Sequence, residues 1–76
     1  MNDMKFLCTK VKENWLTSPQ NREKVTAQGL SIKEPFIGME INNNEPSEEE
    51  KNKVDKAVNN LFGNHIKAFP IRLIEL

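Results

Sequence analysis

The strongest structural signal in the sequence is an amphipathic helix that runs from Ser47 to Phe62. Ser47 stands where an N-cap is expected, and Glu50, three residues later, completes the pattern of a capping box. Gly63 and Asn64 supply a typical helix stop. The apolar residues of this segment recur at helical spacing and form one stripe: Val54, Ala57, Val58, Leu61 and Phe62. Because the stripe must be buried, the rest of the chain has to provide a surface that covers it.

Short β-rich segments on both sides of this helix are the available partners. Residues 36–41 form an apolar run bounded by turn-forming residues, and Leu30 and Ile32 are placed to extend this strand upstream. Residues 66–76 are partly apolar on both faces, which predicts a strand covered on more than one side. Pro70 cannot donate a ladder hydrogen bond and therefore favours an edge position or a bulge.

The N-terminal third allows two interpretations. Residues 4–16 place apolar side chains at helical spacing, yet their Phe, Cys, Thr, Val and Trp favour a strand. We prefer the strand, because a helix here would leave only two strands, and a two-stranded sheet is marginal. A second, short helix is indicated over residues 19–28, with Ser18 as its cap, Pro19 in its first turn and Gly29 at its end.

The chain has few means of stabilising so small a fold. With 76 residues, one Cys and one His, it can form neither an internal disulfide nor an all-Cys/His zinc site. A domain of this size buries only about 60% of the surface that its unfolded chain exposes, so we expect self-association as a homodimer. The predicted fold is a single small α+β domain over residues 1–76. It has a mainly antiparallel sheet of about three strands, with the main helix, residues 47–62, packed on one face.

Catalytic and metal-binding chemistry finds little support in the sequence. Cys8 lies among apolar neighbours, which is typical of a buried thiol, and His65 follows a helix end, where a cation is favoured. The glutamates of residues 45–50 crowd a solvated first turn, and neighbouring positions there do not share a face. The three glycines are too far apart for a phosphate-binding loop. We expect no enzymatic activity, no catalytic residues, no cofactor and no metal site.

The sequence also bears on the compartment. No apolar run is long enough to span a bilayer, and the N-terminus lacks the basic and apolar regions of a secretory signal. We expect a soluble cytoplasmic protein without a membrane partner. By analogy alone, short chains without motifs are typical of accessory proteins of phages and mobile elements, which act in the host cytoplasm. Ten Asn and nine Lys against two Arg fit an AT-rich genome of that kind.

The formal net charge is zero, but the charges are segregated along the chain. Residues 1–35 carry six basic and four acidic side chains, residues 36–50 carry five acidic and no basic ones, and residues 51–76 carry five basic and two acidic ones. Nucleic-acid binding usually requires a basic stripe and favours arginine, which is scarce here. It is therefore the alternative function, assigned to an N-terminal patch of Lys10, Lys12, Arg22 and Lys24.

The favoured function is non-enzymatic protein binding, of the kind performed by small inhibitors or modulators of another protein. The C-terminal strand invites strand addition or dimerisation, because it is apolar on both faces. Trp15 is of a residue type enriched at binding hot spots, and the acidic segment can attract a basic partner. The candidate contact residues are Trp15, Glu45, Glu48, Glu49, Ile71, Leu73 and Ile74.

Overall fold

The computed structural model describes residues 4–63 and 70–76 of the chain. The elements are, in order, β1 (Lys5–Lys10), the 3₁₀ helix η1 (Trp15–Thr17), α1 (Pro19–Ala27), β2 (Ser31–Lys33), β3 (Phe36–Ile41), α2 (Glu48–Phe62) and β4 (Arg72–Glu75). The predicted α+β class is confirmed, with four strands in the described sheet in place of about three. The short second helix is also confirmed, as α1.

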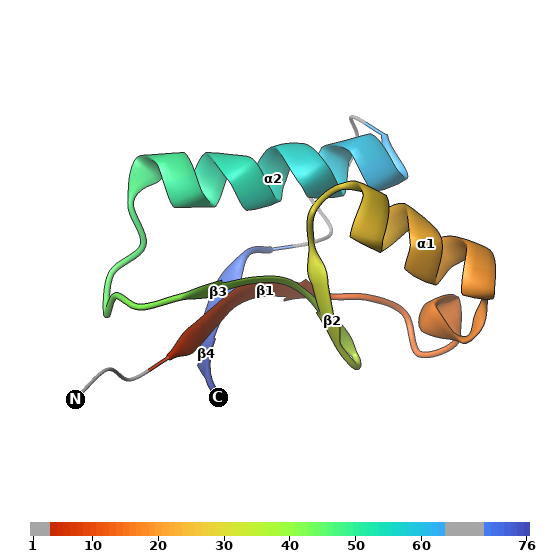
Figure 1. The fold of residues 1–76 in the computed structure, drawn as a ribbon, viewed down its shortest axis with the longest axis horizontal. Coiled ribbons are helices and arrows are strands. Elements are labelled where there is room, and N and C mark those ends of the chain that lie inside the picture. The colour runs from red at the N-terminus through yellow and green to blue at the C-terminus, as the bar shows by residue number, and fades with distance from the viewer. Residues whose placement is uncertain (1–3, 64–69) are drawn as a thin grey trace.

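The four strands form one sheet in the order β2-β3-β1-β4. β1 pairs antiparallel with β3 and β4, and β2 pairs antiparallel with β3. β1 and β2 therefore run parallel to each other, as do β3 and β4, which gives two interleaved β-α-β units. Both helices lie on one side of this sheet, α2 across its middle and α1 at one end (Figure 1). Many unrelated functions occur on such a split β-α-β arrangement, so the topology by itself assigns none.

The N-terminal third is a strand followed by a single turn of helix. β1 lies between β3 and β4, and four of its six residues are buried. The strand interpretation is confirmed for Lys5–Lys10, and the helical alternative is wrong there; only Trp15–Thr17 is helical. The central position explains why the pattern was ambiguous. A strand flanked on both edges and buried on both faces is almost continuously apolar and loses the alternation by which strands are recognised.

The prediction that Ile32 extends the strand of residues 36–41 is wrong. The segment around Ile32 forms the separate strand β2. Ile32 pairs with Ile37 and Lys33 pairs with Phe36, so β2 and β3 are a hairpin joined at Glu34–Pro35. A proline at this position cannot donate to a ladder, which is consistent with a turn. This hairpin supplies the fourth strand.

Local sequence sets the ends of both helices as expected. The Ser47 hydroxyl accepts a hydrogen bond from the Glu50 N–H at 3.1 Å, and the Glu50 carboxylate accepts one from the Ser47 N–H at 2.8 Å. These two bonds complete the predicted capping box of α2. The helix ends at Phe62 and is followed by its C-cap, Gly63, whose φ of +87° favours glycine. Asn64 lies outside the described residues. α1 begins with Pro19 in its first turn.

β4 is shorter than the strand predicted over residues 66–76. It covers Arg72–Glu75, pairs with β1 and is an edge strand of the described sheet, which is one of the two positions that Pro70 favours. Residues 64–69, which include His65, lie outside the described part of the chain, so the predicted role of His65 stays a prediction.

The core consists of two clusters between the sheet and the helices. We call the first the closed end; its buried residues are Val11, Leu16, Val25, Leu30, Ile37 and Ala57. We call the second the open end; its buried residues are Leu7, Ile41, Val54 and Val58. Of the described helices, α1, α2 and η1 all contribute residues to the closed end, whereas the open end takes its helical residues from α2 and its other residues from β1 and β3. Of the two apolar residues that follow Pro19 in α1, Val25 is buried in the closed end and Ala27 is exposed.

β3 approaches β1 very closely at Gly38. A Cβ atom placed on this residue would lie 2.1 Å from the Leu7 carbonyl oxygen and 2.6 Å from the Cys8 Cα. These contacts are with backbone of the neighbouring strand, which cannot move aside without disturbing the ladder. The sheet therefore requires glycine at this position.

Candidate protein-binding site

A hollow of about 440 Å³ lies between α2 and the edge strand β4. Its apolar lining, which we call the floor, consists of Leu7, Ile71 and Leu73. Four charged residues also line it: Glu48, Lys51 and Asp55 on α2, which we call the rim, and Arg72 on β4. The rim residues share one face of α2 because they are three and four positions apart. Ile71 and Leu73 remain half-buried, so the side of β4 that faces the helix is incompletely covered.

The outer edge of β4 is unpaired within the described sheet. β1 occupies its other edge, with Phe6 opposite Ile74 and Leu7 opposite Leu73. Successive side chains of a strand alternate between faces, so Leu73 lies on the helix side with Leu7, and Ile74 lies on the opposite side with Phe6. An unpaired edge presents backbone donors and acceptors to a further strand.

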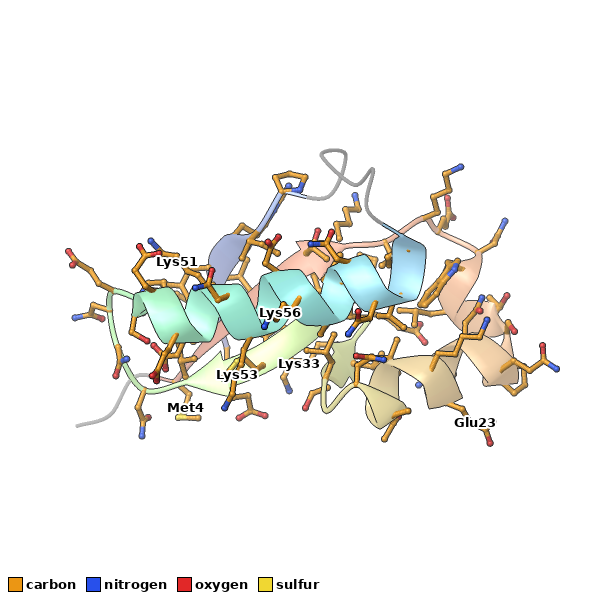
Figure 2. All side chains as sticks on the ribbon, turned by 90° about the horizontal axis from the view of Figure 1, so that it is seen from above. Met4, Glu23, Lys33, Lys51, Lys53 and Lys56 are labelled. Atoms are coloured by element: carbon orange, nitrogen blue, oxygen red, sulfur yellow. The ribbon has the colours of Figure 1, made fainter. Side chains whose placement is uncertain are left out.

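The charges beside the hollow are only partly compensated. Lys51 lies 3.7 Å from Glu48, and Figure 2 shows Lys51 and Lys53 on opposite sides of α2. The Glu50 carboxylate is engaged in the capping box and also accepts from the Asn43 amide at 3.0 Å. Three further carboxylates of this region have no hydrogen-bond or ion-pair partner among the described residues: Glu45, Glu49 and Asp55. The start of α2 is therefore an acidic surface.

The structure brings together two of the surfaces that the sequence suggested separately. Glu48 from the acidic segment lines the same hollow as Ile71 and Leu73 from the C-terminal strand. Glu45 and Glu49 are exposed near the end of the hollow marked by Glu48. Sequence alone could not pair these surfaces, because their proximity depends on the strand order.

Trp15 lies in the other part of the molecule. Its ring is half-buried and packs on Phe62, with centroids 4.8 Å apart and planes at 47°. Both rings pack against the closed end of the core. The Trp15 carbonyl also accepts a hydrogen bond from the Asn21 amide at 2.8 Å. Trp15 therefore seals the core, and the structure does not place it with the other candidate contact residues.

The basic patch proposed for nucleic acid is interrupted by acidic groups. Arg22 donates hydrogen bonds to the Leu16 carbonyl and to the Glu34 carboxylate, with which it forms an ion pair. Lys12 lines a smaller hollow of about 240 Å³ together with Glu13 and Glu34. Lys10 and Lys24 are exposed, on β1 and α1 respectively. Such interleaving of opposite charges weakens the field that a phosphate backbone would meet.

Other chemistry is sparse in the part of the chain that the structure describes. Cys8 is fully buried, and burial raises the pKa of its thiol to about 11, while nearby Arg72 acts weakly in the opposite direction. No group of three or more His, Cys, Asp or Glu in residues 4–63 and 70–76 is placed to hold a metal ion. Within the same residues, no helix combines the length and the apolar character needed to cross a membrane.

Two large apolar residues near the end of β4 are exposed. Met4 and Leu76 are 38% and 53% exposed, and they adjoin the terminal pair of β1 and β4, Lys5 with Glu75. The pairing register therefore places them near each other, at the end of the sheet where β4 ends. Only the register reveals this proximity, because the two residues are 72 positions apart in the chain.

Comparisons of this chain with protein-family models, with curated proteins and with solved structures find no match. The functional argument therefore rests on the hollow, the free strand edge and the charges beside them.

Proposed function

We propose that this chain is a non-enzymatic protein-binding module, of the kind that acts as a small inhibitor or modulator, and that it works in the cytoplasm. The observation that carries the proposal is the position of the hollow beside the unpaired edge of β4. Main-chain groups of an edge supply affinity for a partner strand, and an adjoining apolar floor supplies specificity. Ile71 and Leu73, half-buried in the isolated chain, gain burial when a partner covers them.

The test is an affinity pull-down from cells of the source organism, with and without nuclease. The variant Asn52→Trp places a large ring at an exposed position on the wall of the hollow, so it blocks the site while leaving the core intact. Gln20→Trp makes the same change on the exposed surface of α1 and is the matched control. We expect a protein that is retained by the wild type and by Gln20→Trp and is lost with Asn52→Trp.

Two results would count against this proposal. If every captured protein binds Asn52→Trp as well as the wild type, the hollow is not the binding site. If capture disappears with nuclease, the alternative of nucleic-acid binding through Lys10, Lys12, Arg22 and Lys24 takes its place. Sedimentation of the purified chain tests the predicted homodimer, and a monomer at high concentration would contradict it.

A further inference from the structure

Resting on this proposed function, we infer that the partner is an extended segment that adds as a strand to the free edge of β4. It places apolar side chains in the hollow and a basic side chain at the acidic start of α2. Three features of the described residues support this chemistry: the unpaired edge of β4, the apolar residues of the adjoining hollow and the carboxylates at the start of α2.

The two edges of the sheet differ in what they offer to a strand. β2, at one edge, has only three residues and a hairpin connection to β3 that fixes its end at Glu34–Pro35. β4, at the other edge, has four residues, of which Leu73 and Ile74 in the centre are apolar. Both strands are short, so the edges differ mainly in their surroundings: β4 contributes Arg72 and Leu73 to the lining of the hollow of about 440 Å³. β4 is therefore the edge at which the side chains of an added strand have this space beside them.

The hollow lies where the side chains of an added strand would project. A neighbouring strand runs about 4.8 Å from β4, and every second side chain points to the helix side of the sheet. These side chains would lie beside Leu73 and beneath the rim of α2 at Lys51 and Asp55. A volume of about 440 Å³ accommodates apolar side chains there, so the segment is expected to alternate apolar and polar residues.

The carboxylates at the start of α2 favour a basic group at that end of the site, while Lys51 and Arg72 are the two basic residues of its lining. β3 and β4 run parallel, and α2 begins one loop after β3 ends, so the start of α2 lies at the end of the sheet where β4 ends. Figure 1 shows this loop rising from β3 to the start of α2. Residues 45–50 contribute four carboxylates there, and Asp55 adds an unpaired one on the rim. Opposite charge on a partner accelerates its encounter and fixes its register.

The same charges argue against a second copy of this chain at the site. Two copies of β4 paired antiparallel about a two-fold axis would form one continuous sheet, with the helices on the same side. Because the strands are antiparallel, the acidic starts of the two α2 helices would lie at opposite ends of the seam, each next to β4 of the other copy. That strand carries one basic and one acidic residue, Arg72 and Glu75, so a second copy brings no net positive charge to the acidic surface. A basic segment of a different protein does bring positive charge there.

Synthetic peptides provide the probe. The first is a capped octapeptide in which lysine and valine alternate, the second replaces each lysine with glutamate, and the third has the composition of the first in a block order. We expect fluorescence anisotropy to show at least about tenfold tighter binding of the first peptide than of the other two. Amide chemical shifts should change along β4 and around the hollow, and much less on α1.

Backbone methylation tests strand addition directly. Successive N–H groups of a strand point to opposite edges, so two peptides are made, one methylated at the odd-numbered nitrogens and one at the even-numbered nitrogens. One of them lacks the donors that face β4, and the other lacks the donors that face solvent. One methylated peptide should lose binding and the other should keep it. Equal binding of both would overturn strand addition, whatever the peptide's charge.

Charge-reversal variants test the acidic surface. Asp55→Lys should weaken the lysine–valine peptide by about fivefold or more, because it places a like charge on the rim. Glu23→Lys changes the net charge equally, on the part of α1 that Figure 2 shows far from Lys51, and should have little effect. Equal loss in both variants would indicate attraction to overall charge and would overturn the site.

Two further outcomes separate this inference from the proposed function. A natural partner that depends on the hollow while none of the peptides binds selectively would overturn the partner chemistry and keep the proposed function. A dimer of the purified chain that Asn52→Trp dissociates would overturn the basic partner and assign the site to a second copy.

Discussion

The two ends of the core differ in how completely their apolar side chains are covered. At the closed end, Trp15 packs on Phe62, and α1 contributes Val25, which is completely buried. At the open end, Ile71 and Leu73 stay half-buried beside a hollow that no described element fills. Both ends bury apolar side chains and so contribute to the folding free energy. The difference is that the open end also borders the hollow, where the proposed partner would cover further apolar surface.

The largest effect on stability is expected where both ends are disturbed together, in the pairing of β1 with β3. Gly38→Ala forces a Cβ atom against backbone atoms of β1. We expect the free energy of unfolding to fall by about 3 kcal/mol or more, which is a large share of the stability of a domain of this size. Urea unfolding followed by circular dichroism measures the change.

A second glycine provides the control for this substitution. Gly29 has a φ of +79°, and a Cβ atom placed on it would have no neighbouring atom within 4 Å, so Gly29→Ala meets backbone strain without a steric clash. A loss of about 1 kcal/mol is expected there. If Gly38→Ala lowers the free energy of unfolding no more than Gly29→Ala does, β3 does not approach β1 as closely at Gly38 as described.

The next largest effect compares the two ends directly. Val25→Ala removes two methyl groups from a fully buried site and should lower the free energy of unfolding by about 2.5 kcal/mol. Leu73→Ala removes more atoms from a half-buried site and should cost about 1 kcal/mol, because partial exposure reduces the transfer term. Chemical denaturation of both variants gives the two values. A larger cost for Leu73→Ala would reverse the roles of the two ends.

The sequence predicts those parts of this fold that are specified by local signals. The capping box at Ser47, the stop at Gly63 and the first-turn Pro19 each satisfy a local requirement of the backbone, so they can be recognised without a structure. β2 escaped recognition because three residues carry too little periodicity to distinguish a hairpin from an extension of β3.

The candidate site was predictable only in its parts. The acidic helix start and the apolar C-terminal strand are visible in the sequence, but whether they meet depends on β4 pairing with β1. This pairing is non-local, so no spacing along the chain encodes it directly. Trp15 was assigned to binding by residue type, and its packing on Phe62 could not be seen without the fold.

The third effect is the pH dependence of stability that comes from Cys8, on the sheet face that points away from the helices. Burial raises the pKa of Cys8 from an ordinary 9.0 to about 11, so the folded state holds its proton more tightly than the unfolded state. The contribution of the Cys8 thiol to the free energy of unfolding is fully present below pH 9 and is lost as the pH rises from about 9 to 11. Linkage gives a loss of between about 1 and 2 kcal/mol at pH 10.5.

Cys8→Ala isolates this effect from the titration of other groups. The difference in free energy of unfolding between wild type and variant should shrink between pH 8 and pH 10.5, because only the wild type carries the thiol. Parallel urea titrations at both pH values measure this difference. A constant difference would mean that the Cys8 thiol is not desolvated by folding.

The smallest change in the free energy of unfolding is expected at Thr9, which lies between the two ends. Thr9 is completely buried on β1, between Leu7 of the open end and Val11 of the closed end, and its hydroxyl has no hydrogen-bond partner in the described structure. Thr9→Val replaces this hydroxyl with a methyl group of similar size. We expect a gain of up to about 1 kcal/mol, because an unsatisfied buried hydroxyl destabilises the folded state.

A matched threonine shows whether this gain comes from burial. The Thr26 hydroxyl is exposed on α1 and donates to the Arg22 carbonyl at 2.9 Å, so Thr26→Val removes a satisfied group and should bring no gain. Thermal unfolding of both variants compares them. If Thr9→Val lowers the melting temperature, its hydroxyl is satisfied by a buried water, and the two clusters are joined by a polar contact. If it raises the melting temperature, the two ends meet through apolar packing alone, and the proposed partner site at the open end can be altered without loss of that junction.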